Sequence, residues 1–456
     1  MPMRELVAKE VFKWTILSVS AGLMGGFASI IFNYILDSLI HVVDSFRAGL
    51  SVWWLLPALG GLAVGVIHYV LDRDAFNIPC ATDAMVEAVN FRYGKVKPIV
   101  PFLRVITAPI TIATGGSSGR ECPLAYIGCG WASLLSDIIK KFEPLRKLKQ
   151  SFSSLDSRTL GICGAAAALA GIFRAPLGAA IFGVEVLYRK DIEINKILPV
   201  TASSIIGYLL FISVYGSEPL IVLPVMEPLS IIELGFCALI GAIAGIMAIL
   251  WVKTFITIHE MFKHSTIPLW VKPALGGFLE GLILLWLPQV WGMGYEYIQM
   301  AIQGQILFWV MFALIFAKML ATAFSIGSGG AGGVLIPSMY VGAMLGGVLS
   351  MAFHSLDSSI FTHHAAYVGV AMSALYAAAG KVPLSAALLL SEFTHNFWLV
   401  IPMLIANTIA YLISGLHTIY PSQTLRRERA PLRNTLIGLS ILLLIALVYF
   451  YFGRAL

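Results

Sequence analysis

The chain has 456 residues, of which 59% are hydrophobic and 12% are charged, and its mean hydropathy is +0.87. A water-soluble domain would carry about twice that share of charged residues. A disordered chain would be far less apolar. The composition therefore excludes both classes and indicates an integral membrane protein.

The net charge of +6 does not point to a nucleic-acid partner, because Lys and Arg gather between the hydrophobic runs, as they do at membrane boundaries. The cysteines form no Cys-x-x-Cys pair and lie among apolar residues, so neither a disulfide framework nor a zinc site is expected. We expect no metal and no cofactor. The five positions are Cys80, Cys122, Cys129, Cys163 and Cys237.

The first hydrophobic run is Trp14–Leu36. It is too long for the apolar part of a signal peptide and lacks a small-residue cleavage site, so we expect a retained transmembrane helix. The residues before it carry a basic cluster, which places them in the cytoplasm by the positive-inside rule.

Later runs do not match the length of one membrane-spanning helix. Met319–Leu356 is too long and is interrupted by glycines. Val105–Gly119 and Cys122–Ser136 are short and are separated only by Arg120 and Glu121. This pattern predicts helices that stop partway across the membrane and restart, and transport proteins build binding sites at such breaks.

Two pairs of similar segments, called echoes below, indicate an internal duplication. Arg174–Glu185 (RAPLGAAIFGVE) returns as Lys381–Glu392 (KVPLSAALLLSE), 207 residues later. A glycine-rich stretch ending at Pro123 has a counterpart ending at Pro337, 214 residues later. Two echoes in the same order at nearly one spacing predict two transmembrane repeats, either parallel or inverted.

The duplication and the hydrophobic runs divide the chain into five expected segments. A cytoplasmic N-terminal segment precedes the two repeats, and a basic linker leads to an additional C-terminal transmembrane helix over the uncharged run 434–453. The expected bounds are 1–13, 14–217, 218–425, 426–433 and 434–456.

The segment Gly115–Pro123 (GGSSGRECP) joins a flexible backbone to a proline-started helix. Unpaired N–H groups and the positive end of the helix dipole make such a start an anion site. Glu121 places a carboxylate there, in an apolar region, where it can compete with an anion or take up a proton. An isolated Glu at this position could equally well do no more than accept hydrogen bonds from those N–H groups.

The second half favours the functional interpretation. Gly332–Pro337 (GGVLIP) opens another helix with free N–H groups but no acid. Two helix starts that face each other would form one anion pathway with a single carboxylate in it. Glu121 is then expected to act as a gate that blocks when ionised and yields when displaced or protonated.

These motifs resemble those of the CLC family of chloride channels and proton–chloride exchangers. The resemblance rests on Gly-Arg-Glu-x-Pro at Gly119–Pro123, on Gly-Gly-x-x-x-Pro at Gly332–Pro337 and on Ile419–Gln423 (IYPSQ), and it covers roughly Lys13–Arg433. It implies an all-α integral membrane protein of the cell membrane. The implied fold has two inverted repeats of broken, tilted helices, with one pore per subunit of a homodimer.

The resemblance also implies roles for single residues. Glu121 would be the external gating glutamate, beside an outer anion site lined by backbone amides. Amides of the second helix start and the hydroxyl group of Tyr420 would hold a central anion. The implied anion-binding residues are Cys80, Gly119, Arg120, Glu121, Val334, Leu335 and Tyr420.

Cys80 is included because the family usually supplies a serine to the central site. Counting back from Met85 puts Cys80 at that position, whereas a rival register centres on Phe76–Pro79. A thiol is a weaker donor than a hydroxyl group, and a buried cysteine can also be simple packing. Two other departures, Cys122 for a glycine and Leu335 for an aromatic residue, are expected to change the width of the pathway.

Val186 stands where many exchangers of the family carry a glutamate that passes protons, directly after Glu185. A valine cannot relay a proton, and family channels are also apolar there, yet some exchangers manage without this acid. Glu185 and its repeat partner Glu392 are expected to have structural roles at helix ends. We expect a compact form without the nucleotide-binding regulatory domains of many family members, and such a form resembles the microbial exchangers.

The sequence thus predicts transport of chloride or a similar small anion across the lipid bilayer, coupled to protons, with an uncoupled channel or uniporter as the alternative. An intramembrane hydrolase is the alternative from another class. Gly115–Gly119 fits Gly-x-Ser-x-Gly with Ser117 as nucleophile, but that motif needs a preceding strand and His and acid partners. A membrane helix is expected before it, and the histidines downstream, from His259 on, lack a matching acid motif. We therefore expect no enzymatic activity.

Overall fold

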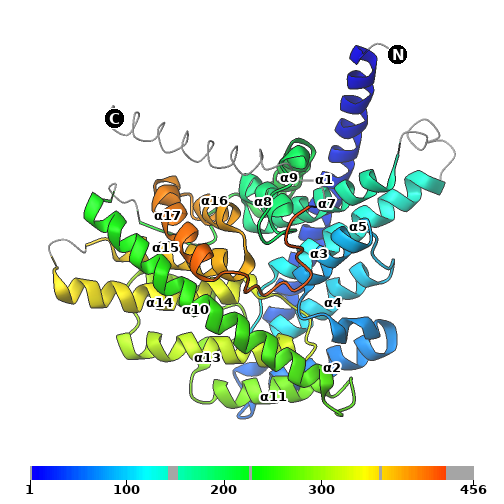
Figure 1. The fold of residues 1–456 in the computed structure, drawn as a ribbon. Coiled ribbons are helices and arrows are strands. Elements are labelled where there is room, and N and C mark those ends of the chain that lie inside the picture. The colour runs from blue at the N-terminus through cyan, green and yellow to red at the C-terminus, as the bar shows by residue number, and fades with distance from the viewer. Residues whose placement is uncertain (1–2, 142–151, 225–228, 359–361, 428–456) are drawn as a thin grey trace.

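The computed structural model describes residues 3–141, 152–224, 229–358 and 362–427, and for residues 3–9 only the backbone. The described chain is built from α-helices joined by turns and short 3-10 segments (Figure 1). The predicted C-terminal helix over 434–453 lies outside the described residues, as does most of the basic loop after Lys141.

The helices of the first half are α1 Met3–Arg47, α2 Leu56–Leu71, α3 Ala81–Phe91, α4 Val100–Ala113, α5 Glu121–Lys141, α7 Ser154–Phe173, α8 Pro176–Glu185 and α9 Ile197–Tyr215. Those of the second half are α10 Ile231–His264, α11 Lys272–Leu284, α12 Tyr295–Ile302, α13 Phe308–Gly327, α14 Leu335–Leu356, α15 His364–Gly380, α16 Pro383–Phe393 and α17 Val400–Ile413.

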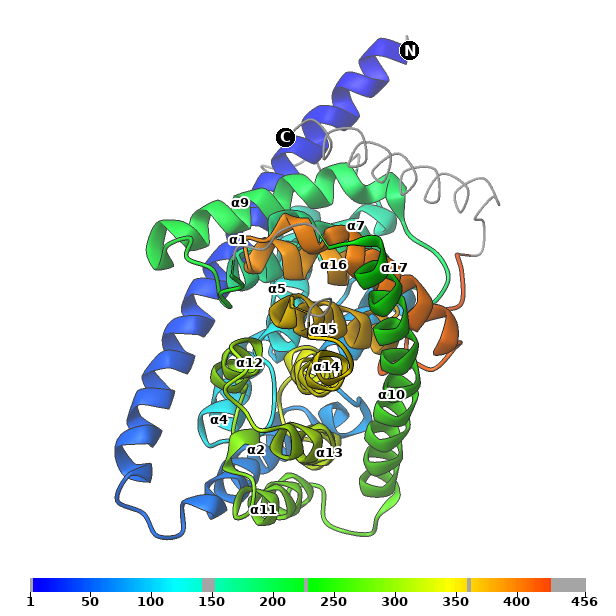
Figure 2. The same ribbon diagram turned by 90° about the vertical axis from the view of Figure 1, so that its left-hand side faces the viewer.

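The two halves repeat one packing pattern. In the first half α1 packs against α7 and α9, and α5 packs against α7; in the second half α10 packs against α15 and α17, and α14 packs against α15. Contacts between α2 and α11 and between α8 and α16 join the halves. Figure 2 shows α13, α14 and α15 as neighbours in one row, nearly end-on.

The sequence echo at Arg174 and Lys381 corresponds to one local structure made twice. Each residue ends a helix in the left-handed region, with φ of 55° and 59°. Pro176 and Pro383 then start α8 and α16. A left-handed C-cap followed by a proline is a standard way to end one helix and begin another, so both halves turn sharply at the same place.

The glutamates at the ends of these echoes hold the halves together. Glu185, at the end of α8, accepts hydrogen bonds from the backbone N–H groups of Leu384 and Ser385 at 3.0 and 2.8 Å. Glu392, in α16, accepts from those of Leu177 and Gly178 at 3.1 and 2.6 Å. Each carboxylate therefore caps the start of the other half's helix, which confirms the structural role predicted for the pair.

The predicted helix breaks are present. The long run Met319–Leu356 is divided, because α13 ends at Gly327 and α14 begins at Leu335. The short runs on either side of Arg120 belong to α4 and α5. The first helix is longer than predicted, since α1 extends beyond Trp14–Leu36 at both ends.

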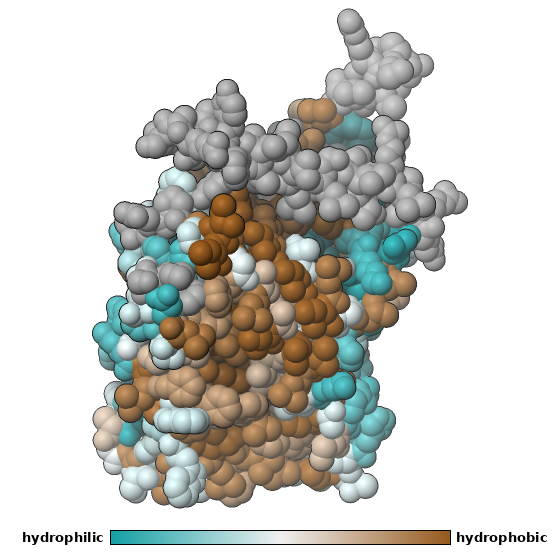
Figure 3. Space-filling model, turned by 60° about the vertical axis from the view of Figure 1, so that its left-hand side comes forward, coloured by the Kyte–Doolittle hydropathy of each residue, from teal (hydrophilic) through white to brown (hydrophobic). Residues whose placement is uncertain are grey.

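Among the described residues, seven helices are long and apolar enough to cross a membrane, and four further apolar helices are shorter. Their outward faces carry large apolar side chains, such as Phe27 on α1, Leu209 on α9 and Ile246 on α10. Figure 3 shows a broad apolar belt between two hydrophilic margins. Side chains that face acyl chains do not need to be polar, so the surface matches a bilayer.

We predict that Glu392→Gln lowers the free energy of unfolding by about 1.5–3 kcal/mol, because hydrogen bonds to a charged acceptor contribute about that much and an amide has only one acceptor oxygen for two donors. Thermal unfolding in detergent, followed by circular dichroism, measures the change. Glu260→Gln, at the exposed end of α10, is the control and should unfold as the wild type does. An unchanged Glu392→Gln would contradict the capping role.

Candidate functional site

The starts of α5 and α14 are joined by backbone pairing. The N–H group of Gly119 donates to the carbonyl oxygen of Gly333 at 2.8 Å, and the two residues form an isolated antiparallel bridge. The N–H group of Gly333 donates to the hydroxyl oxygen of Ser118 at 2.9 Å. The glycine-rich turns of the two repeats thus bring two helix N-termini side by side.

This geometry concentrates positive potential in one small region. The first-turn N–H groups of a helix lack partners within it, and the helix dipole adds to their charge. The amide of Gly119 is already engaged with Gly333, so in this conformation it is not a free donor. The amides of Arg120 and Glu121 lie beside the carboxylate of Glu121.

Glu121 is fully buried at the first position of α5. Its Oε1 accepts a hydrogen bond from the hydroxyl group of Tyr295 at 2.6 Å and lies 3.8 Å from Nε of Arg120. A Cβ atom at Gly119 would lie 2.5 Å from Oε2, so only a glycine leaves room for the carboxylate there. The side chain is therefore folded back over the start of its own helix.

The side chain of Arg120 is directed to α1. Its guanidinium group donates to Oδ1 of Asn33 at 2.8 Å and lies 5.5 Å from the ring centroid of Tyr295. The backbone amide of Arg120 thus lies at the helix start, and its guanidinium group lies beside the carboxylate of Glu121.

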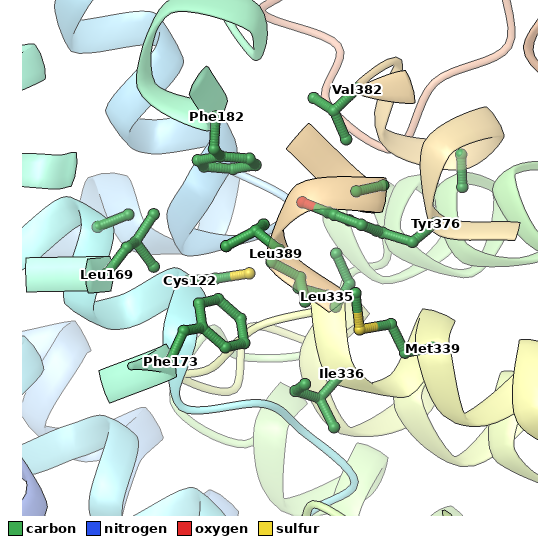
Figure 4. Packing of buried hydrophobic residues seen from close by; sticks show 14 of the residues in the cluster. Cys122, Leu169, Phe173, Phe182, Leu335, Ile336, Met339, Tyr376, Val382 and Leu389 are labelled. Carbon is green, nitrogen blue, oxygen red and sulfur yellow. The ribbon is translucent and has the colours of Figure 1, made fainter. Parts of the chain in front are cut away.

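The start of α14 is lined by apolar atoms and a thiol. Val334 precedes the helix and Leu335 is its first residue, and both are fully buried. Cys122 lies against Gly333, where any added Cβ would clash with the cysteine side chain. Figure 4 shows Cys122 and Leu335 in one core, with the hydroxyl group of Tyr376 directed to the side on which Cys122 lies.

Cys80 lies at the N-cap of α3 and is buried. The next residue, Ala81, donates its N–H to the carbonyl oxygen of Gly332 at 3.5 Å, so this helix start also approaches the glycine-rich turn before α14. Phe76, the centre of the rival register, instead packs edge-on to His68 in the segment before α3. Of the two registers, the one with Cys80 puts its residue at a helix start near the site.

Tyr420 is fully buried, and its hydroxyl oxygen lies 3.2 Å from that of Tyr376 on α15. The segment that carries Tyr420 is fixed to the first half, because Asp83 on α3 accepts from the N–H and the hydroxyl group of Ser422 at 2.8 and 2.9 Å. A short parallel bridge from Tyr188 to Thr424 continues this attachment. Tyr420 and Cys80 are thereby held on the same side of the site.

A buried acid and a buried base support the turn before α5. Glu280 on α11 accepts the N–H of Ser117 at 2.5 Å. Lys318 on α13 donates to the carbonyl oxygens of Val290 and Gly292 at 2.9 and 2.7 Å. Both are fully inaccessible to solvent. The N–H of Ser118 donates to the same Gly292 at 3.4 Å, so the glutamate fixes the turn before α5 and the lysine fixes the loop bonded to it.

Sequence reasoning missed Tyr295, Tyr376 and Asp83, and it gave no role to Glu280 and Lys318. The last two had a usable signal, since a lone ionisable residue inside an apolar run is by default a functional or structural anchor. Tyr295, Tyr376 and Asp83 had none, because their partners are distant in the chain.

The serine predicted as a possible nucleophile does not lie in a hydrolase site. Helix α4, and not a strand, precedes the turn. The hydroxyl group of Ser117 pairs with that of Thr322 at 2.8 Å.

Comparisons of sequence and of structure with known proteins find one family. A sequence model of the family described as voltage gated chloride channel matches residues 78–415. The chain is 27% identical to a putative chloride channel protein ClcB-like of Ralstonia nicotianae over 90% of its own length and 95% of the relative's. It is 25% identical to the H(+)/Cl(-) exchange transporter ClcA of Vibrio campbellii, over 92% of each chain.

Among solved structures, a CLC-type fluoride/proton antiporter superposes with a TM-score of 0.76 at 21% identity, covering 93% of this chain and all of that one. The chain belongs to the CLC family. The predicted fold class is confirmed: this is an all-α, multi-pass integral membrane protein with the CLC architecture.

We predict that Lys318→Met lowers the free energy of unfolding by about 1–3 kcal/mol, because it leaves the carbonyl oxygens of Val290 and Gly292 without their donor. The double variant Lys318→Met/Glu280→Gln should be less destabilised than the sum of the single variants, because both residues hold segments that are bonded to each other through Ser118 and Gly292. Thermal unfolding of all three variants tests this, and strict additivity would show that the two groups act independently.

Proposed function

We propose that the chain carries chloride or a similar small anion across the membrane through the region between the starts of α5 and α14, in exchange for protons, with Glu121 as the gate. One observation carries the proposal: the buried Glu121 carboxylate is folded over the helix start, where an anion would bind. No enzymatic activity is proposed.

The chemistry of the surrounding groups supports an anion site. Backbone N–H groups and hydroxyl groups donate hydrogen bonds without adding a fixed positive charge, so an anion can bind and leave. The outer position would use the amides of Arg120 and Glu121. The central position would use those of Val334 and Leu335, the hydroxyl group of Tyr420 and the thiol of Cys80.

Proton coupling is supported by Glu121 itself, because a carboxylate that occupies the anion's position can leave it by taking up a proton. Relatives named as proton exchangers point the same way. An uncoupled channel is the second candidate, and Val186 favours it. This residue is fully buried at the end of α8, with its carbonyl oxygen bonded to the side chain of Gln423 at 2.9 Å, and it offers no titratable group.

We also propose a homodimer. Helix α9 presents Leu198, Ile205 and Leu209 outward beside α8, and such a surface suits either lipid or a second copy. The small residues near Pro176 and Pro383 do not contribute to this surface, because they are buried between α8 and α16 within one chain. The mass of the detergent-solubilised protein, measured by light scattering, distinguishes a monomer from a dimer.

Flux from purified protein in chloride-loaded liposomes, with chloride and external pH recorded together, tests the function. Uphill proton movement driven by the chloride gradient would establish exchange and would mean that protons bypass Val186. Chloride efflux without proton movement would establish a uniporter. If fluoride or nitrate moved but chloride did not, the transported anion would not be chloride. Cys80 would then be the first position to test.

We predict that Glu121→Gln removes proton coupling and makes chloride flux independent of external pH, because the amide can neither ionise nor take up a proton. In the wild type, chloride flux should increase as external pH falls, because protonation of Glu121 releases the blocking carboxylate. Glu260→Gln, exposed at the end of α10 and outside the site, should behave as the wild type does. Unchanged coupling and pH response in Glu121→Gln would refute the gate.

We predict that Tyr420→Ala weakens chloride binding at the central position by about tenfold, the effect of losing about one hydrogen bond to a charged group. Isothermal titration of the detergent-solubilised protein with chloride measures it. Tyr411→Phe, which loses a hydroxyl group bonded to Arg189 outside the site, serves as the control and should leave the affinity unchanged.

A further inference from the structure

We propose that Tyr295 is the latch of the gate: a positioning residue whose hydroxyl group holds the Glu121 carboxylate over the start of α5 and so sets how easily external anions and protons displace it. The inference rests on the proposed gating role of Glu121. It adds a residue from the second half of the chain, on α12, to a gate that the sequence motif places wholly in the first half.

The contact is short and directed at one oxygen. The hydroxyl group of Tyr295 donates to Oε1 of Glu121 at 2.6 Å, a length typical of hydrogen bonds to a carboxylate. Arg120 approaches the same oxygen only to 3.8 Å, and its guanidinium group is already bonded to Asn33. Among the described side chains, Tyr295 is thus the one that donates a hydrogen bond to this carboxylate.

The position of Tyr295 is fixed by the backbone before it. Gly292 and Gly294 adopt φ of 54° and 80°, and α12 begins at Tyr295 itself. Lys318 holds the carbonyl oxygen of Gly292, and Gly292 in turn donates its N–H to Gly115 at 2.9 Å. The same loop that supports the turn before α5 therefore also aims the tyrosine at the carboxylate of that helix.

Tyr295 also borders a pocket of about 250 Å³, so the latch can be reached from outside the core. Arg47, at the end of α1, lies on the wall of this pocket, 4.2 Å from the ring centroid of Trp291. Asp44 and Glu296 line the same pocket, so its wall carries both signs of charge. An anion that enters here meets the half-buried Tyr295 before it meets the buried Glu121.

The titratable groups that face Glu121 come from three elements. They are Arg120 and Cys122 at the start of α5, Tyr295 on α12 and Tyr376 on α15. Of these, Arg120 and Tyr295 approach Oε1. Removing the phenolic oxygen of Tyr295 changes the hydrogen bonding of the carboxylate while leaving the arginine in place.

The test is Tyr295→Phe in liposomes, with chloride uptake recorded against external chloride concentration and external pH. Without the latch, the ionised carboxylate is held less tightly. The chloride concentration for half-maximal uptake at pH 7.5 should fall by about tenfold, and the pH of half-activation should rise by about one unit, as expected for one hydrogen bond to a charged group. The maximal rate at low pH, where Glu121 is protonated and displaced, should stay the same.

Tyr297→Phe is the matched control, because Tyr297 is also half-buried, lies on α12 and borders the same pocket. It should follow the wild type. In a Glu121→Gln background, where flux should not depend on pH, Tyr295→Phe should change the chloride concentration for half-maximal uptake by less than twofold. An equal effect in that background would mean that Tyr295 acts through the fold and would overturn the latch.

The outcomes separate the latch from the gate. If Glu121→Gln loses the pH response while Tyr295→Phe matches the wild type, the latch is refuted and the gate stands. If Glu121→Gln itself keeps the pH response, the gating role fails. Should Tyr295→Phe not fold, 3,5-difluorotyrosine at position 295 keeps the ring and makes the hydroxyl group a stronger donor. The pH of half-activation should then be lower than in the wild type. No shift, or a shift to higher pH, would refute the latch.

Discussion

The structure depends on the pairing of Gly119 with Gly333. This bridge joins the N-termini of α5 and α14, although the two helices begin 214 residues apart in the chain. Bringing two helix starts together is electrostatically unfavourable unless negative charge lies between them, because both ends of the dipoles are positive. The folded-back carboxylate of Glu121 supplies negative charge at this place. The proposed gate therefore also offsets an electrostatic cost of the fold.

The rest of the molecule keeps this arrangement in place. Glu280 and Lys318 fix the turns on one side, and the Asp83–Ser422 contact fixes the segment of Tyr420 on the other. These supports are hydrogen bonds made by buried polar groups, which are stronger at low dielectric than in water. The backbone around the helix starts is thus held by contacts from α3, α11 and α13.

Much of the fold could be predicted because the signals are local. Glycines and a proline around Arg120 mark a helix break and restart, and the Arg174 and Lys381 echoes mark a helix end followed by a new start. Glu121 could be selected as the candidate gate because a carboxylate at such a restart is chemically unusual. The role proposed for Tyr295 could not be predicted, because it depends on a contact with Glu121, 174 positions earlier in the chain. The length of the first helix was also missed, because α1 continues beyond its uncharged run into segments with charged residues.

The exchange of caps between Glu185 and Glu392 has a consequence for how the chain is made. Helix α8 begins with two amides whose acceptor is a carboxylate on α16, and α16 begins with two amides whose acceptor is on α8. While the ribosome is still producing the first half, the amides of α8 have no partner of their own, and within a bilayer such amides cannot be satisfied by lipid. The first half therefore reaches its final packing only after α16 has been inserted. The last quarter of the chain is therefore needed to complete the fold of the first half.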